Sequence, residues 1–261
     1  MSSLINLNSS KNQRETEGLI LGGSNAVFSL SAEILTELSS QSWYNLSLLN
    51  EGVSKKNYFS FIKDYLDEEF RSKVKVIVYS TIVPFRKNLI FDRKKSKRDI
   101  YGNPSYFRLP QKKLITFLRE KLEGSRNKPL NFPMPNKYGD FNFEKFSCFE
   151  KEMAEFEHED LRIAFEWTED LLRSTKLLFP NAKIIFLYPS QYQPDELEEK
   201  KGKEIFESLS KELYENDART LFYYQKQFAS LNLLCDDFHH ANERGRKWRT
   251  IGLHKNIIKE K

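Results

Sequence analysis

Short apolar runs that end abruptly on turn-forming or polar residues constrain the fold of this chain more than any other feature. The first run, residues 19–21, stops at two glycines and is followed by a helix-prone stretch at residues 31–38. Buried strands of a parallel sheet have this short apolar character, and helices usually connect them because a parallel crossover is long. The pattern predicts a strand, a sharp turn and a helix at the start of the domain.

The same alternation continues along the chain. Strands are predicted at three segments rich in β-branched and aromatic residues: 43–46, 74–79 and 183–188. Helices are predicted where apolar residues recur at helical spacing: 55–70, 111–122, 156–178, 203–214 and around Leu221. The apolar run at residues 231–234 is predicted as the last strand. We therefore expect an α/β fold, a three-layer α/β/α sandwich with a mostly parallel, flavodoxin-like sheet.

The composition fits one folded domain. The chain has 261 residues, 39% of them hydrophobic and 14% aromatic, so it can bury one sizeable core without needing a second domain. Residues 1–17 are polar and rich in Ser and Asn, and we expect a disordered tail there, before a single domain at residues 18–261. The pattern weakens over about residues 86–142, which predicts an insertion or a lid.

Hydropathy, cysteine usage and charge exclude several classes. No window approaches the roughly 18 to 20 continuous apolar residues of a membrane span. Cys148 and Cys235 are predicted to be free thiols, and because the N-terminus lacks a secretory pattern, a cytoplasmic protein is expected. Part of the formal charge of +5 comes from basic runs at residues 93–98 and 244–249, which we interpret as solvated faces and not as a nucleic-acid site. No oligomeric state is predicted.

Side chains that suit nucleophilic catalysis follow the first and the last predicted strands. Ser24 follows the first, and Asp237 and His240 follow the last. In folds of this class, ligands bind at the carboxyl ends of the strands. A hydroxyl nucleophile needs a base that takes its proton and an acid that fixes the tautomer of that base, so these three side-chain types form a consistent set.

The residues around these side chains resemble two sequence blocks of the SGNH (GDSL-type) hydrolase and acyltransferase superfamily. The segment Gly23-Ser24-Asn25 is similar to the first block. The last block has the form Asp, two residues, His, one residue, Asn, two residues, Gly. The chain matches it at Asp237, His240, Asn242 and Gly245. This spacing selects His240 over His239 as the catalytic histidine.

The resemblance implies a serine-dependent acyl-ester enzyme, with Ser24 as nucleophile, His240 as base and Asp237 as the acid that orients it. It implies no cofactor, apart from an acyl donor as co-substrate if the enzyme is a transferase. The substrate it implies carries a small acyl group, such as acetyl, on a hydroxylated compound such as a carbohydrate. The first block looks most like that of the polysaccharide-modifying group, and hydrolysis and acyl transfer both stay open.

The oxyanion hole is the part in which the chain departs from the family pattern. The backbone N–H of Ser24 is the first candidate donor. Asn50 stands near the position of a family glycine, and its main-chain N–H would serve in the same way. The third family block supplies an asparagine side chain, whereas this chain has Ser80 and Thr81, whose hydroxyls are the candidates.

Three alternative interpretations compete with an acyl-ester enzyme. A Gly-Gly-Ser turn can bind phosphate at a helix N-terminus, but no Lys-Ser/Thr follows at P-loop spacing. Carboxylates and imidazoles suit divalent metal ions, and the residues that could supply them are Asp236, Asp237, His239 and His240. The missing third-block asparagine favours the remaining alternative, a non-catalytic binding or scaffold protein on the same fold.

Overall fold

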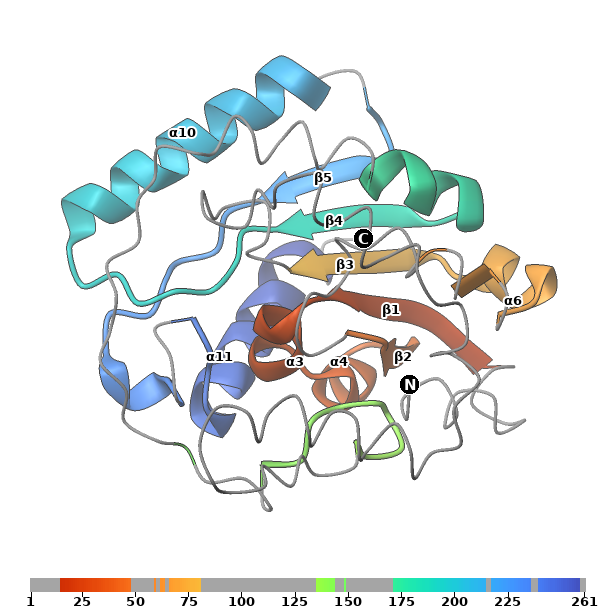
Figure 1. The fold of residues 1–261 in the computed structure, drawn as a ribbon, viewed down its shortest axis with the longest axis horizontal. Coiled ribbons are helices and arrows are strands. Elements are labelled where there is room, and N and C mark those ends of the chain that lie inside the picture. Colours follow the sequence, from red (N-terminus) through yellow and green to blue (C-terminus); the bar gives the residue numbers. More distant parts are fainter. Residues whose placement is uncertain are drawn as a thin grey trace, which may run out of the picture.

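A five-stranded sheet in the order β2-β1-β3-β4-β5, with every neighbouring pair parallel, forms the centre of the protein (Figure 1). The strands are β1 (Thr16–Gly22), β2 (Ser42–Asn45), β3 (Val76–Ser80), β4 (Lys183–Leu187) and β5 (Thr220–Tyr223). This is the flavodoxin-like strand order, so the predicted fold class is confirmed. The structure is a computed structural model that describes residues 15–47, 59, 62–63, 66–80, 135–143, 148, 171–214, 217–235 and 239–258.

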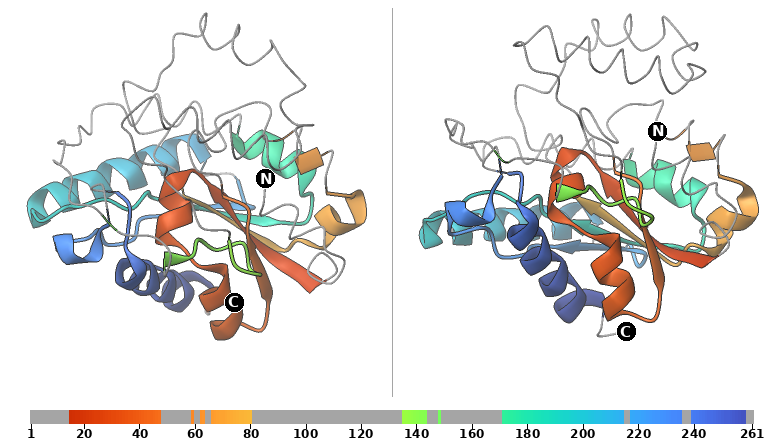
Figure 2. Two further views of the ribbon diagram at one scale, coloured as in Figure 1. Left: turned by 60° about the horizontal axis from the view of Figure 1, so that its bottom comes forward. Right: turned by 90° about the horizontal axis from the view of Figure 1, so that it is seen from below.

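Helices cover both faces of this sheet. They include α3 (Ser24–Ser29), α4 (Ala32–Leu38), α6 (Glu68–Lys73), α10 (Glu196–Tyr214) and α11 (Glu243–Leu253). Residues 171–178 are also helical, as predicted, and the helix ends before Pro180. Figure 2 shows α10 and the 171–178 helix on one side of the sheet and α4 and α11 on the other. The described helices and strands thus form three layers.

Two hydrophobic cores lie on opposite faces of the sheet, and successive residues of a strand contribute to them in turn. Successive side chains of a strand point to opposite faces, so Leu19 and Ile20 of β1 are buried on different sides. Leu19 belongs to the core that contains Phe206 of α10. Ile20 belongs to the core that contains Leu35 of α4 and Leu253 of α11. The sheet is therefore buried on both faces, as is usual for a parallel sheet.

The end of the chain differs from the prediction in two elements. The prediction of a helix around Leu221 is wrong, because this residue lies in β5, an edge strand paired with β4. Its neighbours alternate as a strand requires: Phe222 packs against one core and Tyr223 against the other. The predicted strand at residues 231–234 is also wrong, because Leu231–Leu233 is a 3-10 turn in which Leu231 is 49% exposed.

Part of the expected insertion belongs to the domain itself. Residues 86–134 lie outside the described residues, but residues 135–143 pack against α4. The Asp140 carboxylate is fully buried and accepts hydrogen bonds from Ser31 Oγ at 2.7 Å and from the N–H groups of Ala32 and Glu33 at 2.8 and 2.9 Å. Asp140 therefore caps α4. Strand β1 begins at Thr16, inside the predicted tail, while residues 1–14 are not described.

The sequence predicts that the basic run at residues 244–249 is a solvated face. The structure bears this out for only part of the run. Arg244 and Lys247 are exposed, but Arg249 is fully buried in α11. Burial lowers the pKa of the Arg249 guanidinium to about 9, and its Nη2 donates to the main-chain oxygen of Tyr188, directly after β4. The helical period accounts for the difference, because it turns only some positions of the run toward solvent.

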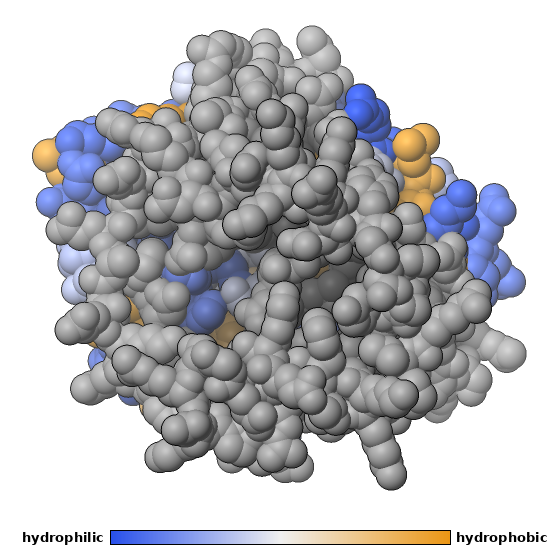
Figure 3. Space-filling model, viewed as in Figure 1, coloured by the Kyte–Doolittle hydropathy of each residue, from blue (hydrophilic) through white to orange (hydrophobic). Residues whose placement is uncertain are grey.

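Hydrophilic residues cover most of the visible surface of α10 (Figure 3), with single apolar side chains such as Leu197, which is 62% exposed. Isolated exposed apolar residues are normal on a globular surface. Within the described ranges, no helix is both long enough and apolar enough to cross a bilayer.

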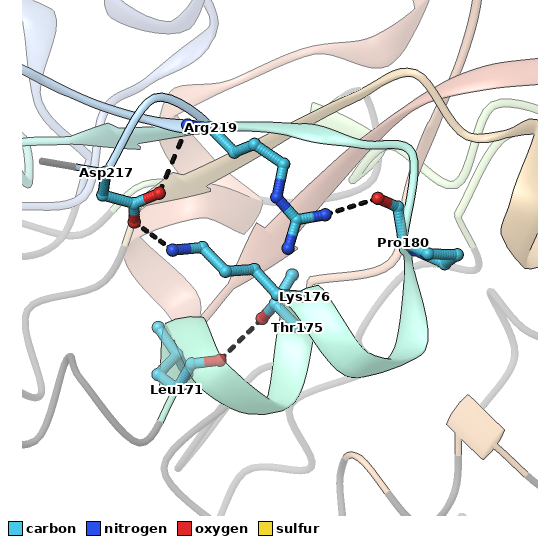
Figure 4. Close-up of polar contacts among 6 residues, drawn as sticks. All are labelled: Leu171, Thr175, Lys176, Pro180, Asp217 and Arg219. Carbon is cyan, nitrogen blue, oxygen red and sulfur yellow. Dashed lines mark hydrogen bonds and ion pairs between the residues drawn. The ribbon is translucent and has the colours of Figure 1, made fainter.

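A half-buried ion pair joins the 171–178 helix to the turn before β5 (Figure 4). Lys176 Nζ donates to Asp217 Oδ2, and the two side chains are 23% and 18% exposed. Beside them, the Arg219 guanidinium donates to the main-chain oxygen of Pro180. Burial by itself raises the pKa of Asp217, but the hydrogen bonds from Lys176 and from the Arg219 N–H outweigh it, so this pKa lies below its usual value.

Lys176→Met should lower the free energy of unfolding by about 1 kcal/mol at neutral pH and by less near pH 3. Because the pKa of Asp217 is lower in the folded than in the unfolded state, the pair stabilises the fold above about pH 4. Its contribution is lost as the pH falls through the folded-state pKa. Urea unfolding of both proteins at the two pH values measures the difference.

The matched control is Lys200→Met, which removes an exposed ammonium 3.9 Å from Glu204. An exposed pair of this kind contributes little, so we expect almost no change in the free energy of unfolding. An equal loss for Lys176→Met at both pH values would contradict the coupling to Asp217.

Candidate active site

The turn after β1 places Ser24 at the carboxyl edge of the sheet. Gly22 has φ 155°, and a Cβ on it would lie 2.1 Å from the main-chain oxygen of Ser80 and 2.7 Å from Ala26 Cβ. Only glycine fits this close approach between β1, β3 and the first turn of α3. Gly23 follows as N-cap and Ser24 as the first residue of α3, with its side chain half-buried.

His240 meets this serine from the other end of the chain. Its Nε2 lies 2.9 Å from Ser24 Oγ, within hydrogen-bond distance, and its side chain is half-buried. The imidazole stacks on Phe28, with 4.5 Å between ring centroids and 20° between the planes. Phe28 lies one turn after Ser24, so one helix carries the hydroxyl and also supports the imidazole.

Main-chain contacts hold the His segment, residues 239–242. The Cys235 N–H donates to the main-chain oxygen of His240 at 2.7 Å, and the Asn242 N–H donates to that of Leu233 at 3.0 Å. Asn242 Oδ1 then caps α11 by accepting from the Gly245 N–H at 3.0 Å. A Cβ on Gly245 would lie 2.2 Å from the oxygen of Leu233. Asn242 and Gly245, both in the predicted motif, thus position the histidine.

The structure describes only part of the predicted site. Ser24, Ser80 and His240 are described, whereas Asn50, Thr81 and Asp237 lie outside the described residues, as does Asp236 of the metal alternative. Ser80 lies at the sheet edge but is fully buried, and its hydroxyl donates to Asn25 Oδ1 at 2.6 Å. The Ser80 hydroxyl has one hydrogen, and this hydrogen bond to Asn25 uses it. The prediction that the Ser80 hydroxyl donates to the oxyanion does not fit this arrangement.

The backbone N–H of Ser24, the first predicted oxyanion donor, lies at the start of α3, and its role stays a prediction. The first N–H groups of a helix have no acceptor within the helix, and Ser24 is the first residue of α3. Its N–H and its Oγ belong to the same residue, so a group that approaches the hydroxyl also comes close to this donor.

Buried polar residues that have no role in the predicted triad lie directly behind the Ser24–His240 pair. Asn25, Ser190 and His239 are 0%, 0% and 3% exposed. Asn25 Nδ2 donates to Ser190 Oγ at 2.8 Å and to the main-chain oxygen of His239 at 3.0 Å. The sequence signal for Asn25 is its place in the segment Gly23-Ser24-Asn25, which resembles the first SGNH block, and Ser190 has no such signal.

Aromatic residues of the 135–143 segment pack against Phe28, on which the imidazole stacks. Phe141 lies 4.8 Å from Phe28 between ring centroids. Arg246 of α11 donates through Nη1 to the main-chain oxygen of Phe141 at 2.7 Å, and its guanidinium carbon lies 4.5 Å from the Phe143 ring centroid. Burial lowers the pKa of Arg246, and the nearby Asp140 carboxylate opposes this shift. This segment thus joins α3 to α11 next to the site.

A disulfide between Cys148 and Cys235 lies next to the His segment, so the prediction of free thiols is wrong. The two residues are 87 positions apart, and only the path of the folded chain brings them together. Disulfides persist mainly in oxidising compartments, so the expectation of a cytoplasmic protein loses the support that it took from free thiols.

Replacing both cysteines, by Cys148→Ser with Cys235→Ser, should lower the free energy of unfolding by about 2 to 4 kcal/mol. The bond closes a long loop, so its loss gives the unfolded chain more conformational freedom. Urea denaturation measures the change, and wild-type protein treated with dithiothreitol is the matched comparison. Equal stability with and without the reductant would contradict a structural role for this bond.

Comparison with known proteins finds a likeness in structure but no match in sequence. No protein-family model matches the chain, and no curated protein has a similar sequence. Among solved structures, the fold is similar to that of an acetyl xylan esterase (Est2A) from the rumen bacterium Butyrivibrio proteoclasticus, with a TM-score of 0.40 and 10% sequence identity. The likeness covers 94% of this chain and 63% of the esterase, so this chain spans less than two thirds of that protein.

Proposed function

We propose that the protein is a serine-dependent enzyme that hydrolyses or transfers a small acyl group. The observation that carries the proposal is the 2.9 Å contact between Ser24 Oγ and His240 Nε2 at the carboxyl edge of a parallel sheet. Nucleophile and base within hydrogen-bond distance are the geometric signature of an activated hydroxyl. Both side chains are half-buried, so a substrate has access to them.

In the proposed reaction, Ser24 Oγ attacks the acyl carbonyl while His240 Nε2 takes the hydroxyl proton. The tetrahedral intermediate collapses, the ester C–O bond breaks, and the imidazolium returns the proton to the departing alcohol. Water or an acceptor hydroxyl then attacks the acyl-serine while His240 Nε2 takes its proton; the bond between the acyl carbon and Ser24 Oγ breaks, and the imidazolium returns the proton to Ser24 Oγ. In this scheme Asp237 orients the imidazole, a role based on its spacing from His240 in the sequence and on the SGNH resemblance.

Stabilisation of the oxyanion is assigned to two main-chain N–H groups and one side-chain hydroxyl. The Ser24 N–H is the first, because it lies at the helix start without an acceptor in the helix. The main-chain N–H of Asn50 and the Thr81 hydroxyl stay proposals from the sequence. Each donor is worth about 3 to 4 kcal/mol in well-studied cases, so a hole with fewer side-chain donors would give a slower enzyme.

For the substrate, we propose a hydroxylated compound such as a carbohydrate that carries an acetyl or similar group. The support is the resemblance of the first and last sequence blocks to the SGNH superfamily and its polysaccharide-modifying group. No cofactor enters the scheme, apart from an acyl donor if the reaction is a transfer.

Wild-type protein should react with a fluorophosphonate probe and hydrolyse an aryl acetate. Ser24→Ala should abolish labelling, and His240→Ala should lower kcat/KM by about 10³-fold or more, because the hydroxyl then lacks its base. Intact-protein mass spectrometry and absorbance of the released phenol measure the two effects. Ser72→Ala, which changes a half-buried serine of α6 whose hydroxyl donates to the main-chain oxygen of Glu69, is the matched control and should react like the wild type.

The proposal is contradicted if the probe does not label the wild-type protein and if the wild type hydrolyses the aryl acetate no faster than Ser24→Ala does. That result would favour the alternative of a non-catalytic binding protein on this fold.

Hydrolysis and transfer are separated by supplying acylated donors together with candidate sugar acceptors. A transferase should yield acylated sugar detectable by mass spectrometry, and its formation should be lost in Ser24→Ala. Release of free acid alone, with every acceptor tried, would identify a hydrolase. The two reactions share the acyl-enzyme and differ only in the group that attacks it.

A further inference from the structure

Two consecutive residues after β1 contact two consecutive residues before α11. Ser24 Oγ lies 2.9 Å from His240 Nε2, and beside this pair Asn25 Nδ2 donates to the main-chain oxygen of His239 at 3.0 Å. Ser24 and His240 are half-buried, whereas Asn25 is fully buried and His239 nearly so. The outer contact is thus open to a substrate, and the inner contact is shielded from water.

The partners of Asn25 determine which way its amide points. Oδ1 accepts from the Ser80 hydroxyl at 2.6 Å and from the Ser190 N–H at 3.2 Å. Nδ2 faces the main-chain oxygens of Ser190 and His239, at 2.9 and 3.0 Å, and Ser190 Oγ at 2.8 Å. A flipped amide would set its NH₂ group against an N–H donor and its oxygen against two carbonyls, so only one orientation satisfies the site.

Through these bonds, one side chain joins four parts of the fold. They are the turn after β1, the end of β3, the loop after β4 and the His segment. Removing the amide would take from the buried Ser80 hydroxyl and the Ser190 N–H the acceptor that they share, at a cost of about 1 to 3 kcal/mol for each group. The Ser24–His240 hydrogen bond is half-exposed and contributes only about 0.5 to 1.5 kcal/mol, so it is poorly suited to hold the two segments together by itself.

We propose that Asn25 is a positioning residue that sets the separation between the Ser24 hydroxyl and the His240 imidazole, by fixing the neighbouring main-chain oxygen of His239. The catalytic consequence rests on the proposed function. The geometric consequence, a looser Ser24–His240 contact in the absence of Asn25, follows from the buried hydrogen bonds alone.

In the active enzyme, Asn25→Ala should lower kcat by about 10- to 100-fold and change KM much less. A displacement of about 1 Å at a reacting group costs on the order of 10²-fold in rate. Asn25 is buried behind the reacting pair and does not itself reach the substrate, so its loss acts on chemistry more than on binding. Steady-state kinetics with an aryl acetate separate the two constants.

A thiol at position 24 tests the geometry without requiring any enzymatic activity. A thiol beside an imidazole forms a thiolate–imidazolium pair, which lowers the thiol pKa below its usual value of about 8.5. The rate of alkylation of Ser24→Cys by iodoacetamide, measured against pH, gives this pKa. Cys148 and Cys235 are joined in a disulfide, so the introduced thiol is the one that reacts.

Three double variants complete the design: Ser24→Cys combined with His240→Ala, with Asn25→Ala or with Tyr79→Phe. The first removes the base and sets the upper limit of the thiol pKa. The last is the matched control, because it deletes a buried 2.9 Å hydrogen bond between Tyr79 and Thr175 away from the His segment. Thermal unfolding of each variant shows that it is folded.

We expect Asn25→Ala to move the thiol pKa at least halfway from the value of Ser24→Cys alone to the value with His240→Ala, and Tyr79→Phe to leave it unchanged. An unchanged pKa with Asn25→Ala would overturn the positioning role while leaving the proposed function intact. No effect of His240→Ala would count against the Ser24–His240 contact, and with it against both proposals.

If Asn25→Ala does not fold, Ser190→Ala takes its place in the same background. It removes the Oγ that accepts from Asn25 Nδ2 and donates to the main-chain oxygen of His239 at 3.2 Å. A smaller rise of the thiol pKa in the same direction supports the proposal, and no rise overturns it.

Discussion

The close approach of β1 to β3 at Gly22 is the constraint on which the site depends. With the main-chain oxygen of Ser80 so near, the chain turns there into α3 without a side chain in the way. The turn delivers Ser24 to the solvent side of the sheet edge and Asn25 to the buried side in a single helical step. The same backbone turn therefore positions both the proposed nucleophile, Ser24, and its buried neighbour, Asn25.

The His segment reaches this turn through a second set of constraints, all of them main-chain or capping contacts. Asn242 caps α11, Gly245 allows the helix to approach Leu233, and Cys235 bonds to His240. Cys235, which donates to this segment, is also joined by a disulfide to Cys148, which follows in the sequence the 135–143 segment that contacts Phe28. Residues from the start, middle and end of the chain therefore share one edge of the sheet.

The elements of the fold that depend on local sequence patterns could be predicted from the sequence. The strand at residues 19–21, its glycine turn and the placement of Ser24 follow from short-range chemistry, and the strand–helix alternation indicates the fold class. Strand β5 could not be predicted in this way. Three of its four residues are aliphatic or aromatic and do not distinguish a strand from a helix, and only the pairing with β4 decides. The partners of Asn25 and the Cys148–Cys235 bond depend on contacts between distant segments, which no local pattern encodes.

The position of Phe28 affects how the site responds to movement of α3. Ser24 and Phe28 belong to one short helix, and the imidazole of His240 stacks on the second of them. A small tilt or slide of α3 would therefore carry the hydroxyl and the surface that supports the imidazole in the same direction. The separation of the reacting atoms is then less sensitive to such movement than it would be if the two side chains rested on independent elements. A substrate that displaces α3 on entry would find the hydroxyl and its base still in register.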